Sequence, residues 1–286
     1  MSVRPGGTGD VVAFYDTHPI NESQVLAALA ARGFGEGPIP VEALIAYDQD
    51  HFGGVEATDA LAQLACVSAG QRLLDVCSGL GGPARWLAHR TGCTVTGLDL
   101  NRGRVAGASR LTGRAGLEGL VQFVQGDALR MPFPDGCFHV VMGQEAWCHV
   151  PHKAALLAEC RRVLAPGGVV AFTDILRTGA LLPAEMERLS RDMAFPSLET
   201  LEGYAASLDA AGFEVLQVED LSTLWTEVLV ERLAMYRSLG PGTARAFGAA
   251  RSADWDAFYA FFVGLYQLGR LGGGRFLARA RDPAAD

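Results

Sequence analysis

Residues 72–85 read Arg72-Leu73-Leu74-Asp75-Val76-Cys77-Ser78-Gly79-Leu80-Gly81-Gly82-Pro83-Ala84-Arg85. A short apolar run containing Asp75 leads into a glycine-rich turn. A helix is expected to begin at Pro83, because the missing N–H of proline would have no partner in a first helical turn. Glycines let the backbone approach a ligand closely, and a helix N-terminus offers free N–H groups. Strand, turn and helix in this order predict a nucleotide-binding crevice at the carboxyl end of a parallel strand.

Later apolar segments also lead to polar residues. We expect strands over residues 93–99, 120–124 and 138–142. Asp99 ends the first of these strands, and an acid at that position can bind both ribose hydroxyls of a nucleoside. Asp127 follows the second strand. Because the carboxyl ends of parallel strands meet at one edge of a sheet, these acids are expected at one ligand site.

Five motifs recur in order and together resemble the class I S-adenosylmethionine (SAM) dependent methyltransferases of the small-molecule branch. That branch includes the tocopherol, ubiquinone/menaquinone and sarcosine/dimethylglycine methyltransferases. The motifs are D-x-x-S-G-x-G-G from Asp75, G-L-D ending at Asp99, G-D-A around Asp127, M-P-F-P-D-G-C-F at 131–138 and R-V-L-A-P-G-G at 162–168. The first match is imperfect, because Cys77 stands where the family motif D/E-x-G-x-G-x-G has its first glycine. A cysteine would serve a positive φ at that point poorly.

The resemblance implies an α/β fold, a Rossmann-like seven-stranded and mostly parallel sheet. Residues 1–70 would be a helical N-terminal segment closing over the cofactor, and 71–180 the SAM-binding core. Residues 181–286 would hold helical lid insertions and the last strands, at 213–218 and, antiparallel, at 274–280. The cofactor would be SAM, with S-adenosylhomocysteine as the product.

The resemblance also implies a set of cofactor-binding residues. Asp75 and Gly79 would contact the methionine moiety, Asp99 the ribose and Asp127 the adenine region. Tyr47 is expected to close over the cofactor. The full set is Tyr47, Asp75, Ser78, Gly79, Gly81, Asp99, Leu100, Asp127, Ala128 and Gln144.

The candidate catalytic residues are His149, Glu145 and His51. Methyl transfer needs alignment of the two substrates and removal of a proton from the acceptor. His149 has the near-neutral pKa of a base, whereas Glu145 could hold a cationic acceptor and Trp147 could offer it a cation–π face. Alternatively, His149 and Glu145 only orient their loop. His51, in the loop D-H-F-G-G, is either a second base or part of the closure over SAM.

Residues outside the motifs are less informative. Residues 1–20 contain glycine and proline and are expected to be loose at the start, followed by helices from Asn21, over 41–47 and over 58–69. The segment 221–271 is helical and rich in aromatic residues. Those aromatics indicate either a lid over the acceptor or a plain helical core.

Composition limits the classes of function. The 286 residues carry a formal net charge of −8, which argues against a nucleic-acid partner. No 18-residue apolar span or basic-then-apolar N-terminus is present, so we expect a cytoplasmic protein without a membrane span. The six cysteines contain no CxxC pair and are expected to be reduced. A homodimer is possible.

A metal site is not expected. Glu145, His149 and His152 could form one, but Pro151 interrupts the run and no further ligand is spaced nearby.

The predicted function is transfer of a methyl group to N, O or C of a small-molecule acceptor, in specialised metabolism such as natural product biosynthesis. The alternative is a SAM-binding enzyme of the same fold that catalyses a non-methylating reaction such as cyclisation. Both need the same cofactor residues, so the sequence does not separate them. A binding or regulatory protein would be indicated by loss of those residues, and they are present.

Overall fold

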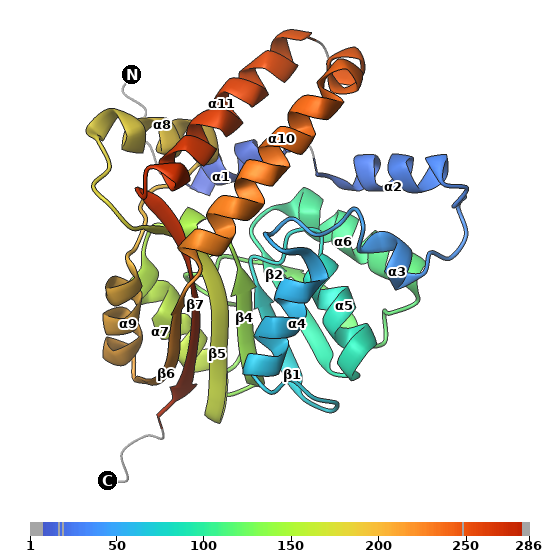
Figure 1. The fold of residues 1–286 in the computed structure, drawn as a ribbon. Coiled ribbons are helices and arrows are strands. Elements are labelled where there is room, and N and C mark those ends of the chain that lie inside the picture. The colour runs from blue at the N-terminus through green and yellow to red at the C-terminus, as the bar shows by residue number, and fades with distance from the viewer. Residues whose placement is uncertain (1–7, 17, 19, 248, 282–286) are drawn as a thin grey trace.

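A seven-stranded sheet forms the centre of the molecule, with strand order β3-β2-β1-β4-β5-β7-β6 (Figure 1). The computed structural model describes residues 8–16, 18, 20–247 and 249–281. Strands β1 to β5 are paired in parallel, and β7 is antiparallel to both β5 and β6. This confirms the predicted fold. The strands are β1 (Arg72–Val76), β2 (Thr94–Asp99), β3 (Val121–Gln125), β4 (Phe138–Gln144), β5 (Leu164–Arg177), β6 (Phe213–Asp220) and β7 (Leu271–Ala280).

Helices cover both faces of the sheet, because neighbouring strand residues point to opposite sides. Leu73 packs with α4 and α5, while Leu74 packs with α7 and α9. The helices are α1 (Thr8–Asp16), α2 (Glu22–Ala31), α3 (Val41–Leu44), α4 (Gly54–Leu64), α5 (Gly82–Thr91), α6 (Arg102–Ala115), α7 (Lys153–Val163), α8 (Pro183–Met193), α9 (Leu201–Ala210), α10 (Ser222–Phe247) and α11 (Ala249–Gln267), with a 3-10 turn η1 (Trp147–His149).

The strand order reverses between β1 and β4, which are neighbours in the sheet although β2 and β3 intervene in the chain. The loops after these two strands therefore leave toward opposite faces and open a crevice at the carboxyl edge. Asp75 pairs with Gly97 of β2 and with Met142 of β4. The acidic end of the 72–85 stretch thus lies at the centre of the sheet, where a ligand is expected.

The long helices α10 and α11 lie side by side above this edge of the sheet (Figure 1). Their buried aromatic side chains form an apolar cluster with Ile175 of β5 and Cys148 of η1. The members from α10 and α11 are Trp225, Leu229, Phe258, Tyr259, Phe262, Val263, Leu265 and Tyr266. The aromatic side chains of 221–271 that the structure describes therefore form a core of their own, which fixes the two helices beside the crevice.

Three element boundaries differ from the sequence-based expectation. Residues 8–16 form helix α1, although the first helix was expected only from Asn21, and residues 1–7, where the start of the chain was expected to be loose, lie outside the described chain. The helix expected over 58–69 is α4, displaced to Gly54–Leu64. Strand β5 begins at Leu164, so it includes the Pro166-Gly167-Gly168 segment, whose proline and glycines are typical of a turn. A register shift between Phe138 and Val140 in the pairing of β4 with β5 accommodates that segment.

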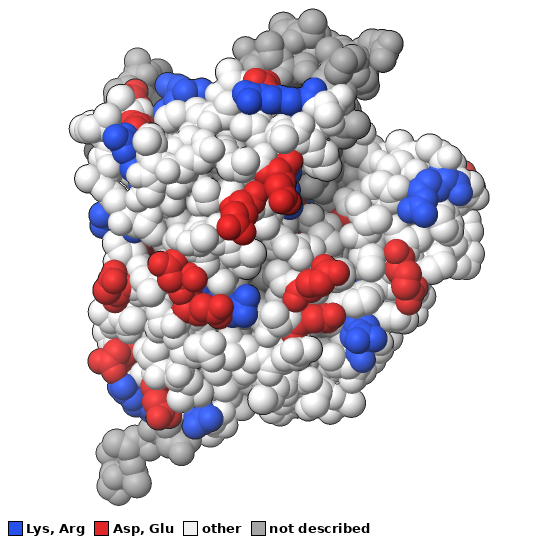
Figure 2. Space-filling model, viewed as in Figure 1, with Lys and Arg blue, Asp and Glu red and all other residues white. Residues whose placement is uncertain are grey.

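All six cysteines are free thiols, and Cys93, Cys148 and Cys160 are buried. Within the described part of the chain, no helix is long and apolar enough to span a membrane. Acidic and basic side chains alternate over the face shown in Figure 2, and the acidic ones predominate at its centre.

Candidate active site

The glycine turn after β1 requires left-handed backbone at three positions. Cys77 has φ 65°, Gly79 has φ 56° and Gly81 has φ 74°. The backbone N–H groups of Cys77 and Ser78 both donate to the carbonyl oxygen of Leu98, at 2.8 and 3.0 Å. This pairing with β2 holds the turn in place, so the cysteine adopts the conformation that a glycine would favour.

Asp75 is a buried carboxylate with an unused oxygen. Its Oδ2 atom is buried without a hydrogen-bond partner in the described structure, and the same holds for Oγ of the neighbouring Ser78. Burial, and then the nearby charge of Asp99, raises the pKa of Asp75 to about 7. Since buried polar atoms are normally paired, these two atoms indicate a ligand that brings its own donors. An ammonium group such as that of a methionine moiety fits this site.

Asp99 is held by the backbone around it. Its Oδ2 accepts from the N–H of Gly79, and its Oδ1 accepts from the N–H of Asn101, both at 2.8 Å. These bonds join the end of β2 to the glycine turn and to the start of α6. Each carboxylate oxygen keeps lone pairs for a further donor, such as a ribose hydroxyl.

One pocket collects most of the predicted residues. The predicted residues that line it are His51, Asp75, Ser78, Gly79, Asp99, Leu100, Asp127, Ala128, Gln144, Glu145 and His149. They come from the carboxyl ends of β1 to β4 and from the loop before α4. The structure therefore brings the cofactor and acceptor candidates together at the crevice.

Tyr47 and Gly81 do not belong to this lining. Tyr47 packs against the apolar cluster of α2, α3 and α6, with its hydroxyl 3.5 Å from Nη1 of Arg32. Gly81 caps the N-terminus of α5. A Cβ atom on Gly81 would lie 2.2 Å from the ring of Phe123, so this glycine allows close packing beside the site.

Glu145 ties two elements together. Its carboxylate accepts from the N–H of Phe52 and from the hydroxyl of Thr173, both at 2.5 Å. Burial raises its pKa to about 7, against the lowering effect of these bonds. The residue has φ 46°, an unfavourable value for a non-glycine residue that local structure must enforce. Of the two roles considered, the contacts favour an orienting one over capture of a cationic acceptor.

Trp147 does not reach the pocket. Its indole is fully buried and stacks on Phe172 with ring centroids 4.2 Å apart. The expectation of a cation–π face for the acceptor is therefore wrong, because the turn η1 directs this side chain into the core.

His51 is held by a buried polar network. Its Nε2 lies 2.9 Å from Oε1 of Gln49 and 3.2 Å from the hydroxyl of Thr58, which itself donates to Gln144 at 3.0 Å. Burial lowers the pKa of His51 to about 4, so the ring is neutral at physiological pH. These contacts connect the D-H-F-G-G loop to the end of β4.

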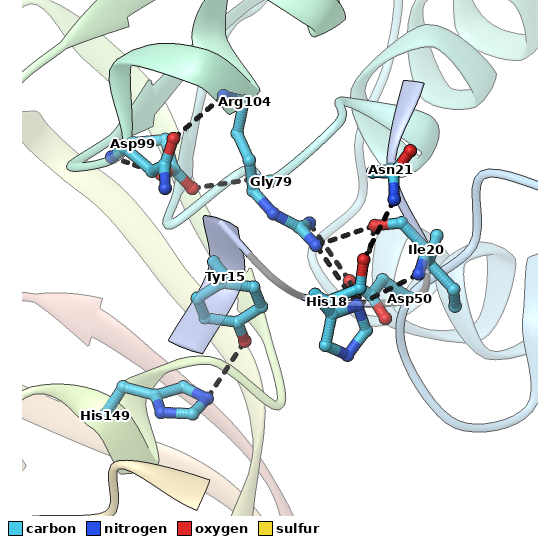
Figure 3. Close-up of polar contacts among 10 residues, drawn as sticks. Tyr15, His18, Ile20, Asn21, Asp50, Gly79, Asp99, Arg104 and His149 are labelled. Atoms are coloured by element: carbon cyan, nitrogen blue, oxygen red, sulfur yellow. Dashed lines mark hydrogen bonds and ion pairs between the residues drawn. The ribbon is translucent and has the colours of Figure 1, made fainter. Parts of the chain in front are cut away.

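His149 lies beside Tyr15 of α1 (Figure 3). The Tyr15 hydroxyl is 2.9 Å from Nε2, and Nδ1 is 3.4 Å from the carbonyl oxygen of Ala194. A carbonyl only accepts, so Nδ1 carries the proton and Nε2 accepts from the tyrosine. Burial lowers the pKa of His149 to about 4 and raises that of Tyr15 well above its usual value. The pair therefore consists of a neutral imidazole and a protonated phenol.

Sequence reasoning missed the contribution of α1. Asp10, Val11, Val12 and Tyr15 of this helix line the pocket, as does Arg104 of α6. The apolar and aromatic run Val11-Val12-Ala13-Phe14-Tyr15 was the available signal for a helix with a buried face.

The metal alternative gains no support from the geometry. Among the residues that the structure describes, no three His, Cys, Asp or Glu side chains are grouped as metal ligands.

Part of the chain is similar to known methyltransferases. Residues 74–172 match the family described as a methyltransferase domain. The methyltransferase GfsG of Streptomyces halstedii is 36% identical over 172 residues, covering 59% of this chain and 62% of its own. The 27-O-demethylrifamycin SV methyltransferase of Amycolatopsis mediterranei is 34% identical over 168 residues, covering 58% and 62%. The chain thus spans about six-tenths of the length of these relatives.

Similarity among solved structures extends over the whole chain. The crystal structure of the [4+2]-cyclase SpnF superposes with a TM-score of 0.74 over 99% of this chain and 100% of its own, at 24% identity. At that identity the likeness concerns the fold alone.

Proposed function

Residues 74–172 place this chain in the methyltransferase-domain family, and on that premise we propose that it O-methylates a hydroxyl group of a neutral small molecule with SAM as donor. The observation that carries the proposal is the pairing of two features across one pocket. Asp75, whose Oδ2 atom is buried without a partner in the described structure, lies on the donor side, and the neutral His149 with its Tyr15 partner lies on the other side.

On the donor side, three acids have separate tasks. SAM, when bound, supplies a methyl group that its sulfonium already activates. Asp75 pairs with the ammonium of the methionine moiety, Asp99 accepts from the ribose hydroxyls, and Asp127 faces the adenine region. The backbone bonds that Asp99 already receives keep its carboxylate in one orientation before the cofactor arrives.

On the acceptor side, Tyr15 and His149 move one proton. As the acceptor oxygen takes the methyl group, its proton passes to the Tyr15 oxygen. The Tyr15 proton passes to Nε2 of His149, which becomes an imidazolium with both nitrogens protonated. A low pKa suits this task in one respect, because it keeps His149 unprotonated at neutral pH.

The walls near His149 favour a neutral and largely apolar acceptor. Val150 and Pro151 follow His149 in the chain, the Ala194 carbonyl accepts from its ring, and Val11, Val12 and Pro196 belong to the same pocket lining. Arg104 is the one Lys or Arg in the described lining, and it already donates to Asp50. An anionic acceptor would therefore find no free cation there. The relative named for 27-O-demethylrifamycin SV is consistent with transfer to oxygen in natural product chemistry.

The test is incubation with methyl-labelled SAM and a panel of neutral hydroxylated metabolites, using the wild-type protein, His149→Ala and Tyr15→Phe. We expect His149→Ala to lower kcat by ~10²–10⁴-fold at saturating acceptor. Tyr15→Phe should show a loss of the same order, because it removes the hydroxyl and keeps the ring. Near-native turnover in His149→Ala would remove the base and leave alignment as the mechanism.

The non-methylating alternative has a separate readout. The fold shared with a [4+2]-cyclase makes the comparison useful, although a fold does not establish an activity. Methyl transfer releases one S-adenosylhomocysteine for each product and adds label to it. A rearranged product of unchanged mass, formed without S-adenosylhomocysteine, would overturn the proposal.

The cytoplasmic location and the possible homodimer remain predictions.

A further inference from the structure

Arg104 is a buried cation in the first turn of α6 with partners on several sides (Figure 3). Its Nη1 donates to Asp50 at 3.0 Å, and its Nη2 donates to the carbonyl oxygen of Ile20 at 3.0 Å. The centre of the guanidinium lies 4.3 Å from the centroid of the Tyr15 ring. A planar guanidinium can stack on an aromatic ring and donate at its edge at the same time.

The same arginine touches the cofactor turn. A Cβ atom on Gly79 would lie 3.0 Å from Nη1 of Arg104, so the guanidinium lies directly against this glycine. Gly79 in turn donates to Asp99, the predicted ribose ligand. Arg104 is therefore in contact with the donor side of the pocket and with the ring whose hydroxyl meets His149.

A second tie joins α1 to the same turn of α6. The side chain of Asn101 donates to Asp16 of α1 at 2.8 Å, and its oxygen accepts from the N–H of Arg104 at 3.0 Å. The N–H of Asn101 donates to Asp99. Helix α1 is thus docked at both Tyr15 and Asp16 on residues adjacent to the donor site.

We propose that Arg104 is a positioning residue for methyl transfer: it holds the Tyr15 ring so that the tyrosine hydroxyl meets His149 when α1 is docked on α6. The expected effect of Arg104 on kcat rests on the proposed function. Its expected effect on the position of the Tyr15 ring does not. Arg104 acts through Tyr15. A lysine cannot replace it, because an ammonium lacks the planar face and the fork of donors.

Kinetics supply the first test, with Arg104→Lys, Arg104→Gln and a matched control. Both variants should lower kcat by ~10–100-fold, because a displacement of a catalytic group by about 1 Å causes a loss of this size. The KM for SAM should change much less. In a Tyr15→Leu background, Arg104→Gln should cause no further loss, because the ring on which it acts is gone. The control is Arg110→Gln, since Arg110 is an exposed arginine of the same helix that pairs with Glu22. It should leave kcat unchanged.

Proton NMR supplies a readout that does not need turnover. In the wild type, His149 should titrate far below an exposed histidine, since it is buried beneath α1. In Arg104→Gln and in Tyr15→Leu its titration should shift upward toward that of an exposed histidine, and in Arg110→Gln it should not move. If Arg104→Gln does not fold, Arg104→Lys keeps the charge but lacks the planar face and the fork of donors, and it should shift the titration in the same direction.

The outcomes separate the two proposals. Absence of methyl transfer by the wild type would reject the proposed function, while the His149 titration would still judge the role of Arg104. An unchanged titration in the folded Arg104→Gln variant would overturn the inference. A loss confined to the KM for SAM would also overturn it. So would losses of kcat that multiply in the variant carrying both Tyr15→Leu and Arg104→Gln, since either result would show that Arg104 acts independently of Tyr15.

Discussion

Asp75 combines a stability cost with a binding function. A group whose folded pKa exceeds its unfolded value favours the folded state at low pH, and this contribution is lost as pH rises through the folded pKa. For Asp75 the folded value is about 7, so at pH 8 an ionised carboxylate is buried with its Oδ2 atom unpartnered in the described structure.

We therefore expect Asp75→Asn to be more stable than the wild type at pH 8 by about 1–3 kcal/mol, the usual cost of an unsatisfied buried group. Urea denaturation measures this difference. The variant should also lose the rise in Tm that SAM gives the wild type, because the partner of the ammonium is gone. At pH 5 the stability gain should shrink, as the wild-type carboxyl is then protonated. A variant that is less stable at pH 8 would contradict the assignment.

Cys77 offers a clean measure of backbone strain. Its φ of 65° is easy for glycine and unfavourable for any residue with a Cβ atom. We expect Cys77→Gly to be more stable than Cys77→Ala by about 1 kcal/mol in the free energy of unfolding. Both variants lack the thiol, which packs against the core. The difference between their free energies of unfolding therefore contains little contribution from that lost packing. Equal stabilities would mean that the turn relaxes in the variants.

At the scale of elements, the contact of α5 with β3 depends on one glycine. The Gly81 position has φ 74° and no room for a Cβ atom against Phe123. Gly81 was expected among the cofactor-binding residues. The structure places it beside the pocket rather than in its lining, where it makes room for the ring of Phe123.

We expect Gly81→Ala to lower the free energy of unfolding by about 1–3 kcal/mol, the usual range for overpacking, with left-handed strain in addition. In a Phe123→Ala background the same substitution should cost less, because the clash is removed and only the strain remains. Denaturant titration of the four proteins completes the cycle. Additive losses would show that the ring of Phe123 is not the obstacle.

Helix α1 shows why some elements escape prediction. Its contacts with His149, Asn101 and Arg104 lie between 85 and 134 residues away along the chain. Local propensity contributes little to so short a helix, and most of its stability comes from tertiary packing. The position of α1 over the pocket therefore follows from docking.

At the scale of the whole molecule, the buried groups predict different pH dependences for binding and for turnover. Asp75 must be ionised to pair with the cofactor ammonium, so SAM affinity should increase as pH rises through about 7. Binding should release protons near that pH, because the cation favours the ionised carboxylate. Calorimetry in two buffers of different ionisation enthalpy measures this release, and Asp75→Asn should abolish it.

Turnover at saturating SAM should follow His149 instead. An ordinary imidazole acting as the base would give a rate that rises near neutral pH. Because burial lowers the pKa of His149 to about 4, the base is already neutral above about pH 5. We therefore expect the protonation of His149 to leave kcat constant between pH 6 and 8. The value of kcat should fall only below about pH 5, where the imidazole becomes protonated. A kcat that rises through pH 7 would indicate a different base.

Much of the molecule followed from patterns that are local in the chain. The apolar run before Asp75, the turn glycines and the acids at strand ends determined a parallel sheet with a nucleotide crevice, because strand ends and turns obey short-range rules. The pocket lining confirms that these acids meet at one edge. The antiparallel strand over 274–280 came from the family resemblance, and the pairing of β7 confirms it.

The tertiary structure alone decided which side chains share the acceptor end of the pocket. Trp147 and His149 are two residues apart, yet one is stacked in the core and the other faces Tyr15. Glu145 is bound to Phe52 and Thr173, which no spacing in the sequence connects. Sequence patterns record preferences over a few residues. Contacts across more than a hundred residues arise when whole elements pack, and that packing set the partners and protonation of His149.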